Sequence, residues 1–162
     1  MMVYPSWPLE ELAGRLQLGQ RDRFADVGCG HGSVTRWLAH RTGATAIGID
    51  PSEVALRRGS AVEDGVRYVI GEPAAVGLRT RSMGAVMVID TMQFAVDADQ
   101  VLRELFRVVR NGGMALAVGP VPRPLRRLSD HAADAGWRTT EEVETPDWFG
   151  RMGEFIDALL VS

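Results

Sequence analysis

Hydrophobic and polar positions change their period repeatedly along the chain, and this pattern predicts alternating strands and helices. Short apolar runs bounded by turn residues predict five strands, over residues 23–27, 44–50, 66–70, 83–90 and 114–119. Apolar residues spaced three and four apart predict helices over residues 9–18, 34–41, 52–62 and 97–110. The run 83–90 is apolar on both faces, as a central parallel strand requires.

The order of these elements predicts a doubly wound α/β fold with a mostly parallel sheet. Ligands of such folds bind beyond the carboxyl ends of the strands, so the loops at those ends are the places to look for a site. Later in the chain the pattern predicts a helix over 125–136, a sixth strand over 137–145 and a final helix over 146–160. We therefore expect one domain, residues 1–162, with its core in residues 20–145.

The composition excludes several classes of function. At 162 residues and 46% hydrophobic, the chain suits one domain with a sizeable core. The net charge of −3 argues against a nucleic-acid partner or an anionic membrane surface, and no stretch has the pattern of a membrane span or a signal peptide. All 18 basic residues are arginine, which excludes a catalytic lysine. Cys29 is the single cysteine, so we expect no internal disulfide and a cytoplasmic location, and no side-chain spacing predicts a metal site.

A glycine-rich turn follows the first strand and carries the candidate chemistry. Its spacing differs from the dinucleotide fingerprint, in which a third glycine stands where Ser33 stands here. Asp26, at the mouth of the turn, would oppose a pyrophosphate and suit a ligand with positive charge. Asp50 ends the second strand, where it can accept hydrogen bonds from two ribose hydroxyls. A ribose and a positive charge without a phosphate clamp describe S-adenosylmethionine.

Five segments in order, within residues 20–145, resemble a class I S-adenosylmethionine-dependent methyltransferase of the small-molecule and natural-product type. They read DVGCGHG, AIGIDPS, VIGEP, VIDTMQF and LRELFRVVRNGGMALAV. The resemblance implies that the glycine turn wraps the cofactor, that Asp50 binds its ribose and that Glu72 faces its adenine. The residues it assigns to the cofactor are Asp26, Gly28, Cys29, Gly30, Gly32, Asp50, Pro51, Gly71, Glu72, Pro73 and Asp90. Asp90 and Gln93 are the candidate catalytic residues, as a base and as a group that orients the acceptor.

The sequence departs from the resembled family in three places. Pro73 has no N–H to donate to the adenine ring, where the family offers a backbone donor. The chain is short at both ends, which predicts that the N-terminal lid and the last strand of the sheet are lacking and that the acceptor pocket is uncovered. The site would then be a natural minimal form, be completed by a homodimer or partner chain, or have lost transfer. For Trp137, Trp148 and Phe149 we favour core packing over dimer contacts.

Three functions follow from these observations. The first is methyl transfer from S-adenosylmethionine, with S-adenosylhomocysteine as product, to a small-molecule acceptor in bacterial secondary metabolism. The second is a repurposed, non-methylating enzyme such as a cyclase. The third is a non-catalytic binding or assembly partner of another protein. No nucleic-acid or membrane partner is expected.

Overall fold

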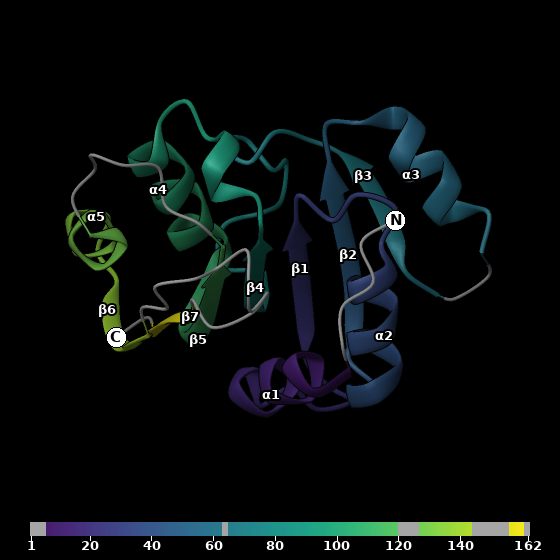
Figure 1. The fold of residues 1–162 in the computed structure, drawn as a ribbon, viewed down its shortest axis with the longest axis horizontal. Coiled ribbons are helices and arrows are strands. Elements are labelled where there is room, and N and C mark those ends of the chain that lie inside the picture. Colours follow the sequence, from purple (N-terminus) through teal and green to yellow (C-terminus); the bar gives the residue numbers. More distant parts are fainter. Residues whose placement is uncertain (1–5, 63–64, 120–126, 144–155, 161–162) are drawn as a thin grey trace.

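A single sheet organises the molecule, and the computed structural model describes it through residues 6–62, 65–119, 127–143 and 156–160. The sheet has seven strands in this part of the chain, in the order β3-β2-β1-β4-β5-β7-β6 (Figure 1). The strands are β1 (Arg23–Val27), β2 (Thr45–Asp50), β3 (Arg67–Ile70), β4 (Met83–Ile89), β5 (Val109–Val118), β6 (Arg138–Val143) and β7 (Ile156–Leu160). The first five are parallel, as predicted, and β7 runs antiparallel to both of its neighbours.

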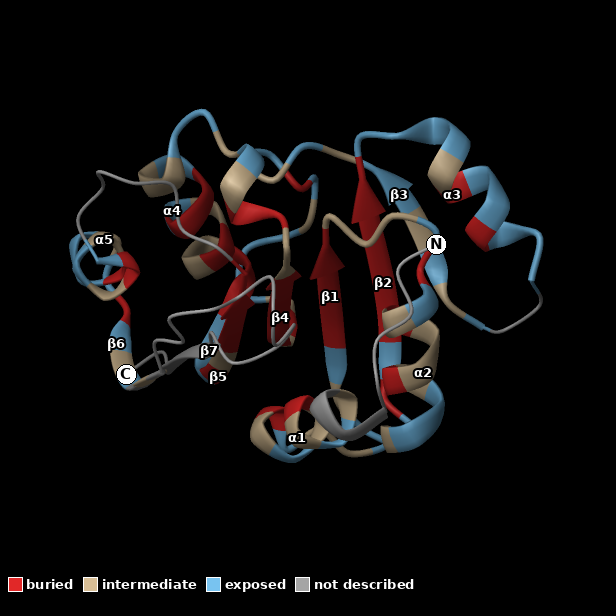
Figure 2. Cartoon of the chain, viewed as in Figure 1, coloured by how far each residue is buried: buried red, intermediate tan, exposed pale blue. Residues whose placement is uncertain are grey.

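Helices cover both faces of the sheet. They are α1 (Ser6–Leu16), α2 (Ser33–Thr42), α3 (Glu53–Ser60), α4 (Ala98–Val108) and α5 (Leu128–Asp134), with a short 3₁₀ turn, η1 (Met92–Phe94). Side chains of α4 and α5 pack with Val86 and Val88 of β4, whereas those of α1 and α2 pack with Ala85 and Met87 on the opposite face. This alternation explains why the sequence of β4 is apolar throughout, and Figure 2 shows the central strands buried. None of the described helices is long and apolar enough to cross a membrane.

The last strand of the sheet is present, so the prediction that it is lacking was wrong. Residues 156–160, expected at the end of a helix, form β7 between β5 and β6. Leu160 pairs with Met114 of β5 on one side and with Arg138 of β6 on the other. Pairing with two strands distant in sequence decides the structure of this five-residue segment, and its hydrophobic spacing does not report such pairing. The open edge expected beside β5 is therefore filled.

The segment before β1 does not test the prediction about the lid. Helix α1 lies near the amino ends of the strands, away from the loops that could form a site (Figure 1). Leu12 and Leu16 anchor it in the core on the α2 face. Residues 1–5 lie outside the described residues, so the absence of a lid stays a prediction.

Of the three aromatic side chains singled out near the end of the chain, only Trp137 lies in the described residues. It is 4% exposed, and its Nε1–H donates to the carbonyl of Leu102 over 3.0 Å. Its ring meets that of Phe106 edge to face, with the centroids 5.4 Å apart. Trp137 is a core residue, as predicted, while Trp148 and Phe149 lie outside the described residues.

Candidate functional site

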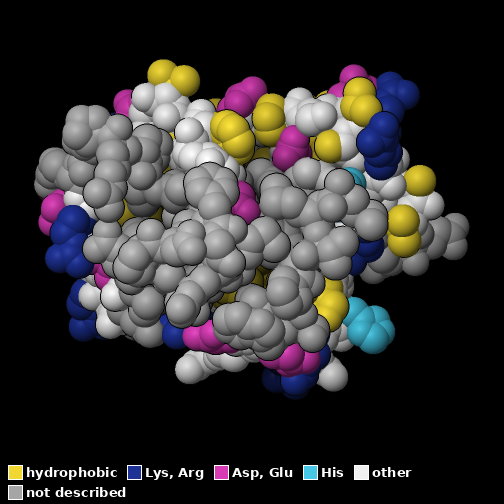
Figure 3. All heavy atoms as spheres, viewed as in Figure 1, with side chains coloured by type: hydrophobic (Ala, Val, Ile, Leu, Met, Phe, Trp, Pro, Cys, Tyr) yellow, Lys and Arg dark blue, Asp and Glu magenta, His cyan; other side chains and the backbone are white. Residues whose placement is uncertain are grey.

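Two adjoining cavities open beyond the carboxyl ends of β1, β2 and β4, where the strand order reverses and ligands of such folds bind. The first has a volume of about 580 Å³ and the second about 650 Å³. Gly28 and Asp90 line both cavities, so the two form one elongated site. The first also contains Asp26, Gly30 and an arginine, and the second contains Asp50. Figure 3 shows hydrophobic and acidic side chains intermixed along this edge of the molecule, at the top of the view.

Asp50 holds the glycine turn against the end of β2. One of its carboxylate oxygens accepts from the N–H of Gly30 over 2.8 Å, and the other accepts from the N–H of Ser52 over 2.8 Å. The carbonyl of Ile49 accepts from the N–H groups of Gly28 and Cys29, at 2.7 and 3.1 Å. Each carboxylate oxygen has two acceptor positions, so Asp50 can still receive ribose hydroxyls while it fixes the turn.

The three glycines of the turn have positive φ angles but face different surroundings. A Cβ on Gly28 (φ 80°) would overlap the hydroxyl of Thr91, and one on Gly32 (φ 76°) would overlap the ring of Tyr68. Gly30 (φ 57°) has no atom within 4 Å of the position that a Cβ would take. Gly28 and Gly32 are thus required by packing within the protein. Only Gly30 leaves free space over its Cα for a ligand.

Asp26 is buried at the base of the first cavity, with 3% of its surface exposed. Burial raises the pKa of Asp26 to about 7. A hydrogen bond from the Thr35 hydroxyl, at 2.5 Å, lowers this pKa in part, and the negative charge of Asp50 raises it. A carboxyl with this pKa is part protonated at neutral pH and becomes fully ionised when a cation lies beside it. The environment of Asp26 therefore suits a positively charged ligand group.

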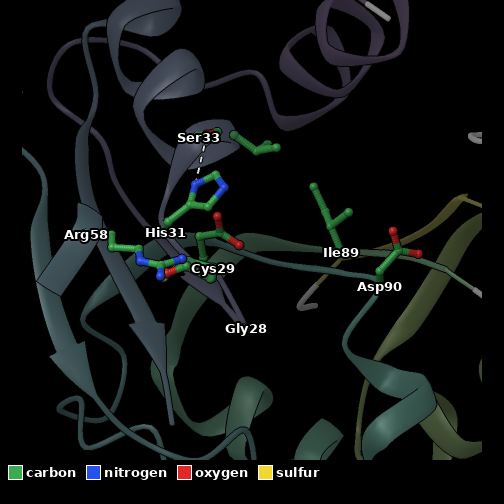
Figure 4. Close-up of a pocket in the computed structure, with 10 residues that line it drawn as sticks. Gly28, Cys29, His31, Ser33, Arg58, Ile89 and Asp90 are labelled. Carbon is green, nitrogen blue, oxygen red and sulfur yellow. Dashed lines mark hydrogen bonds between the residues drawn. The ribbon is translucent and has the colours of Figure 1, made fainter. Parts of the chain in front are cut away.

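The surroundings of Cys29 and His31 do not indicate a catalytic role for either side chain. Burial raises the pKa of the Cys29 thiol, and the charges of Asp26 and Asp50 raise it further, so the group stays a thiol and not a nucleophilic thiolate. The His31 ring is exposed, with Nδ1 at 3.0 Å from the Ser33 hydroxyl (Figure 4). No three His, Cys, Asp or Glu side chains of the described residues lie close enough together to hold a metal ion.

The second cavity is bordered by the turn after β3. The N–H of Ala75 donates to the carbonyl of Glu72 over 2.9 Å and closes this turn, with the Glu72 side chain exposed. Pro73 and Ala74 line the cavity together with Phe94, which is 78% exposed. The N–H of Ala74 makes no hydrogen bond within the described part of the chain, so this turn keeps a backbone donor one residue after the proline. These apolar surfaces suit one face of a flat aromatic ring.

Asp90 and Gln93, the two candidate catalytic residues, occupy different positions. Asp90 follows β4 with φ 52°, a left-handed conformation, and its N–H donates to the carbonyl of Val118 over 2.7 Å. The amide of Gln93 donates back to the main-chain carbonyl of Asp90 over 3.1 Å, and Gln93 lines neither cavity. Asp90 therefore lies in the site, while Gln93 holds the loop that carries it.

Of the remaining residues predicted to bind the cofactor, some line a cavity and others do not. Pro51 and Glu72 line the second cavity. Gly71 and Gly32 are absent from the lining of both cavities. Gly71 instead joins the strands, since its N–H donates to the carbonyl of Asp50 over 3.3 Å. Sequence reasoning missed Phe94 as a lining residue, because its exposure depends on how the loop after β4 folds.

Comparison with known proteins gives a consistent result. Residues 25–117 match a family described as a methyltransferase domain. Methyltransferase GfsG of Streptomyces halstedii is 34% identical over 110 residues, covering 64% of this chain and 40% of that protein. The 27-O-demethylrifamycin SV methyltransferase of Amycolatopsis mediterranei is 30% identical over 156 residues, covering 90% of this chain and 57% of that protein. The chain thus spans about half the length of these curated relatives.

The fold also matches solved structures. A chain in the complex between the Haloferax volcanii Trm112 methyltransferase activator and a putative methyltransferase superimposes with a TM-score of 0.80. The match covers 96% of this chain and 89% of that chain at 17% sequence identity. At this identity the likeness concerns the fold, which is the doubly wound sheet that the sequence predicts.

Proposed function

The chain belongs to the methyltransferase domain family, as a class I S-adenosylmethionine-dependent methyltransferase, and on that premise we propose that it methylates a small-molecule acceptor. When bound, the cofactor supplies a methyl group activated by its sulfonium centre. The observation that carries the proposal is the division of the site into two cavities that share Gly28 and Asp90, with Asp50 in one and Asp26 in the other. That arrangement suits a molecule with a ribose at its centre and a cation at one end.

The residues present fit this cofactor. In the second cavity, Asp50 would accept the ribose hydroxyls, and the apolar surfaces of Pro73 and Phe94 would cover the adenine. The free N–H of Ala74 would take the place of the donor that Pro73 lacks. In the first cavity, Gly30 leaves open space beside the turn, and Asp26 would hold the cationic amino group.

Asp90 would act at the junction of the two cavities. Its backbone is fixed by the hydrogen bond to Val118 and by the amide of Gln93, so the residue is held where the two cavities meet. There it would orient an acceptor hydroxyl or amine and accept its proton. Alignment of the acceptor supplies much of the rate of such a transfer, so a strong base is not required. We place the acceptor among bacterial natural products, a proposal supported by the names of the relatives from Streptomyces and Amycolatopsis.

Calorimetric titration with S-adenosylhomocysteine tests the proposal. We expect the wild type to bind and Asp50→Ala to lose at least tenfold in affinity, because the ribose hydroxyls lose their acceptor. Asp130→Ala, which removes an exposed carboxylate far along the chain, is the matched control and should bind like the wild type. Circular dichroism would verify that each variant is folded. Failure of the wild type to bind at millimolar ligand would overturn the proposal, and binding without transfer to any acceptor would favour a non-methylating enzyme or an assembly partner.

A further inference from the structure

Helix α3 packs closely against the glycine turn, and one of its arginines lines the first cavity. A Cβ on Gly59 would lie 2.9 Å from the carbonyl oxygen of His31 and 3.0 Å from the Tyr68 ring. Gly59 therefore lets the helix approach the turn where a larger residue could not. The preceding residue, Arg58, lines the cavity as a consequence.

Arg58 differs from the neighbouring arginines in having no partner among the described residues. Arg57 forms an ion pair with Glu53 at 2.6 Å, one turn back along α3. Arg36 donates to the carbonyl of His31 over 2.8 Å. Arg58 makes no hydrogen bond or ion pair with any residue that the structure describes, although its side chain lies at a cavity wall. Figure 4 shows it beside Cys29, across the cavity from Asp90.

The first cavity thus has an arginine and an aspartate without partners of opposite charge. Within the described residues, the Asp26 carboxyl accepts a hydrogen bond from a neutral hydroxyl, that of Thr35, and Arg58 offers a planar set of N–H donors. Asp90 also lines this cavity, but it is Asp26 and Arg58 that together are complementary to a zwitterion, and guanidinium groups pair well with carboxylates. An α-amino acid group is such a zwitterion.

We propose that Arg58 binds the carboxylate of the methionine part of S-adenosylmethionine, while Asp26 receives its ammonium group. This inference rests on the proposed function, and it makes Arg58 a residue that selects for the intact amino acid end of the cofactor. An acceptor carboxylate is the other source of the same chemistry. The geometry favours the cofactor, because Asp90, where the acceptor is placed, lies across the cavity from Arg58 (Figure 4).

The experiment compares two ligands that differ in one carboxylate. S-adenosylhomocysteine and its decarboxylated analogue, S-adenosyl-3-thiopropylamine, are titrated into the wild type, Arg58→Ala and Arg57→Ala at low salt. We expect Arg58→Ala to weaken S-adenosylhomocysteine binding about tenfold, as for loss of one charge-assisted hydrogen bond at an exposed site. The same variant should bind the decarboxylated analogue as the wild type does. Arg57→Ala, on the same helix but paired with Glu53, should change neither affinity more than twofold.

The other possible results distinguish a wrong assignment of Arg58 from a wrong proposed function. If Arg58→Ala binds S-adenosylhomocysteine as well as the wild type does, the assignment is overturned. If it weakens both ligands equally, Arg58 supports the turn instead of binding a carboxylate, and the assignment is again overturned. If it leaves cofactor affinity intact but raises the KM of an anionic acceptor, Arg58 serves the acceptor. Lack of binding by the wild type would refute the proposed function itself, which is a distinct result.

Discussion

Replacing Asp26 with asparagine should stabilise the protein without ligand and weaken cofactor binding. The Asp26 carboxyl is buried, and one hydroxyl, that of Thr35, donates to it. An asparagine of nearly the same shape can accept the same hydrogen bond and carries no charge into the buried site. The substitution therefore isolates the free energy of the charge.

The magnitude follows from the pKa of Asp26, which burial raises from 3.8 to about 7. The folded protein then binds a proton at Asp26 more tightly than the unfolded chain does, so stability falls as pH rises from about 4 to 7. Above pH 7 the ionised carboxylate costs at most about 4 kcal/mol, since one pKa unit corresponds to about 1.4 kcal/mol. Asp26→Asn removes this cost, so its advantage over the wild type should be absent at pH 4 and complete at pH 8.

Urea unfolding at several pH values measures this difference directly. We expect Asp26→Asn to gain about 1–4 kcal/mol at pH 8 and nothing at pH 4. Asp130→Asn makes the same change at an exposed carboxylate on α5 and serves as the control, with a small and pH-independent effect. An advantage of Asp26→Asn that is equal at both pH values would show that the buried charge is not its cause.

The pKa of Asp26 should also make ligand binding depend on pH, and in the opposite direction to stability. A cationic group beside Asp26 requires the ionised carboxylate, so the affinity of the wild type for S-adenosylhomocysteine should rise about tenfold from pH 6 to pH 8. Calorimetry in buffers of different ionisation enthalpy should detect release of a proton on binding below pH 7. Asp26→Asn should bind more weakly and without this pH dependence. An affinity of the wild type that does not change with pH would refute the placement of the cation at Asp26.

Four further substitutions test contacts in the site and in the rest of the core. Gly28→Ala should lose more than about 2 kcal/mol of stability in urea unfolding, because the added Cβ would overlap a threonine hydroxyl. Gly30→Ala should lose only about 1–2 kcal/mol, because its Cβ meets open space, and should mainly weaken the binding of S-adenosylhomocysteine. Trp137→Phe should cost about 1–3 kcal/mol in the same assay, since a carbonyl of α4 loses its donor. Hydrogen bonds from Arg107 lower the pKa of Glu104, so Glu104→Gln should destabilise the protein at pH 7 and approach the wild type as pH falls below 4.5.

The parallel part of the sheet could be predicted from the sequence because each of its strands contains a short apolar run bounded by turn residues. Strand β2 begins one residue later than predicted and ends at the predicted Asp50, and β1 has the predicted bounds. Asp26 and Asp50 could be placed for the same reason, since the end of a buried strand in a doubly wound sheet is also the position of its site. The local pattern therefore carried both the fold and the two principal acids.

What the sequence could not predict depends on contacts between distant residues. Strand β7 exists through pairing with two strands far from it in the chain, so a spacing compatible with a helix was misleading. Gly32 must be glycine because a Cβ there would overlap the ring of Tyr68 from β3, and the residues next to Gly32 in the sequence do not indicate this contact. The approach of Arg58 to the cavity depends in turn on Gly59 and the main chain of the glycine turn.

These long-range contacts also decide which cofactor the glycine turn can accept. In a dinucleotide site, N–H groups of the turn and the following helix face a pyrophosphate. Here the N–H of Gly30 is already taken by the Asp50 carboxylate, and Asp26 adds a second acid at the base of the turn. A phosphate about 4 Å from one such carboxylate would be repelled by about 4 kcal/mol at the effective dielectric constant of a protein surface. An acid in the position of Asp50 can receive ribose hydroxyls in either kind of site, whereas Asp26 repels a phosphate and attracts an ammonium, so Asp26 is the acid that favours S-adenosylmethionine over a dinucleotide.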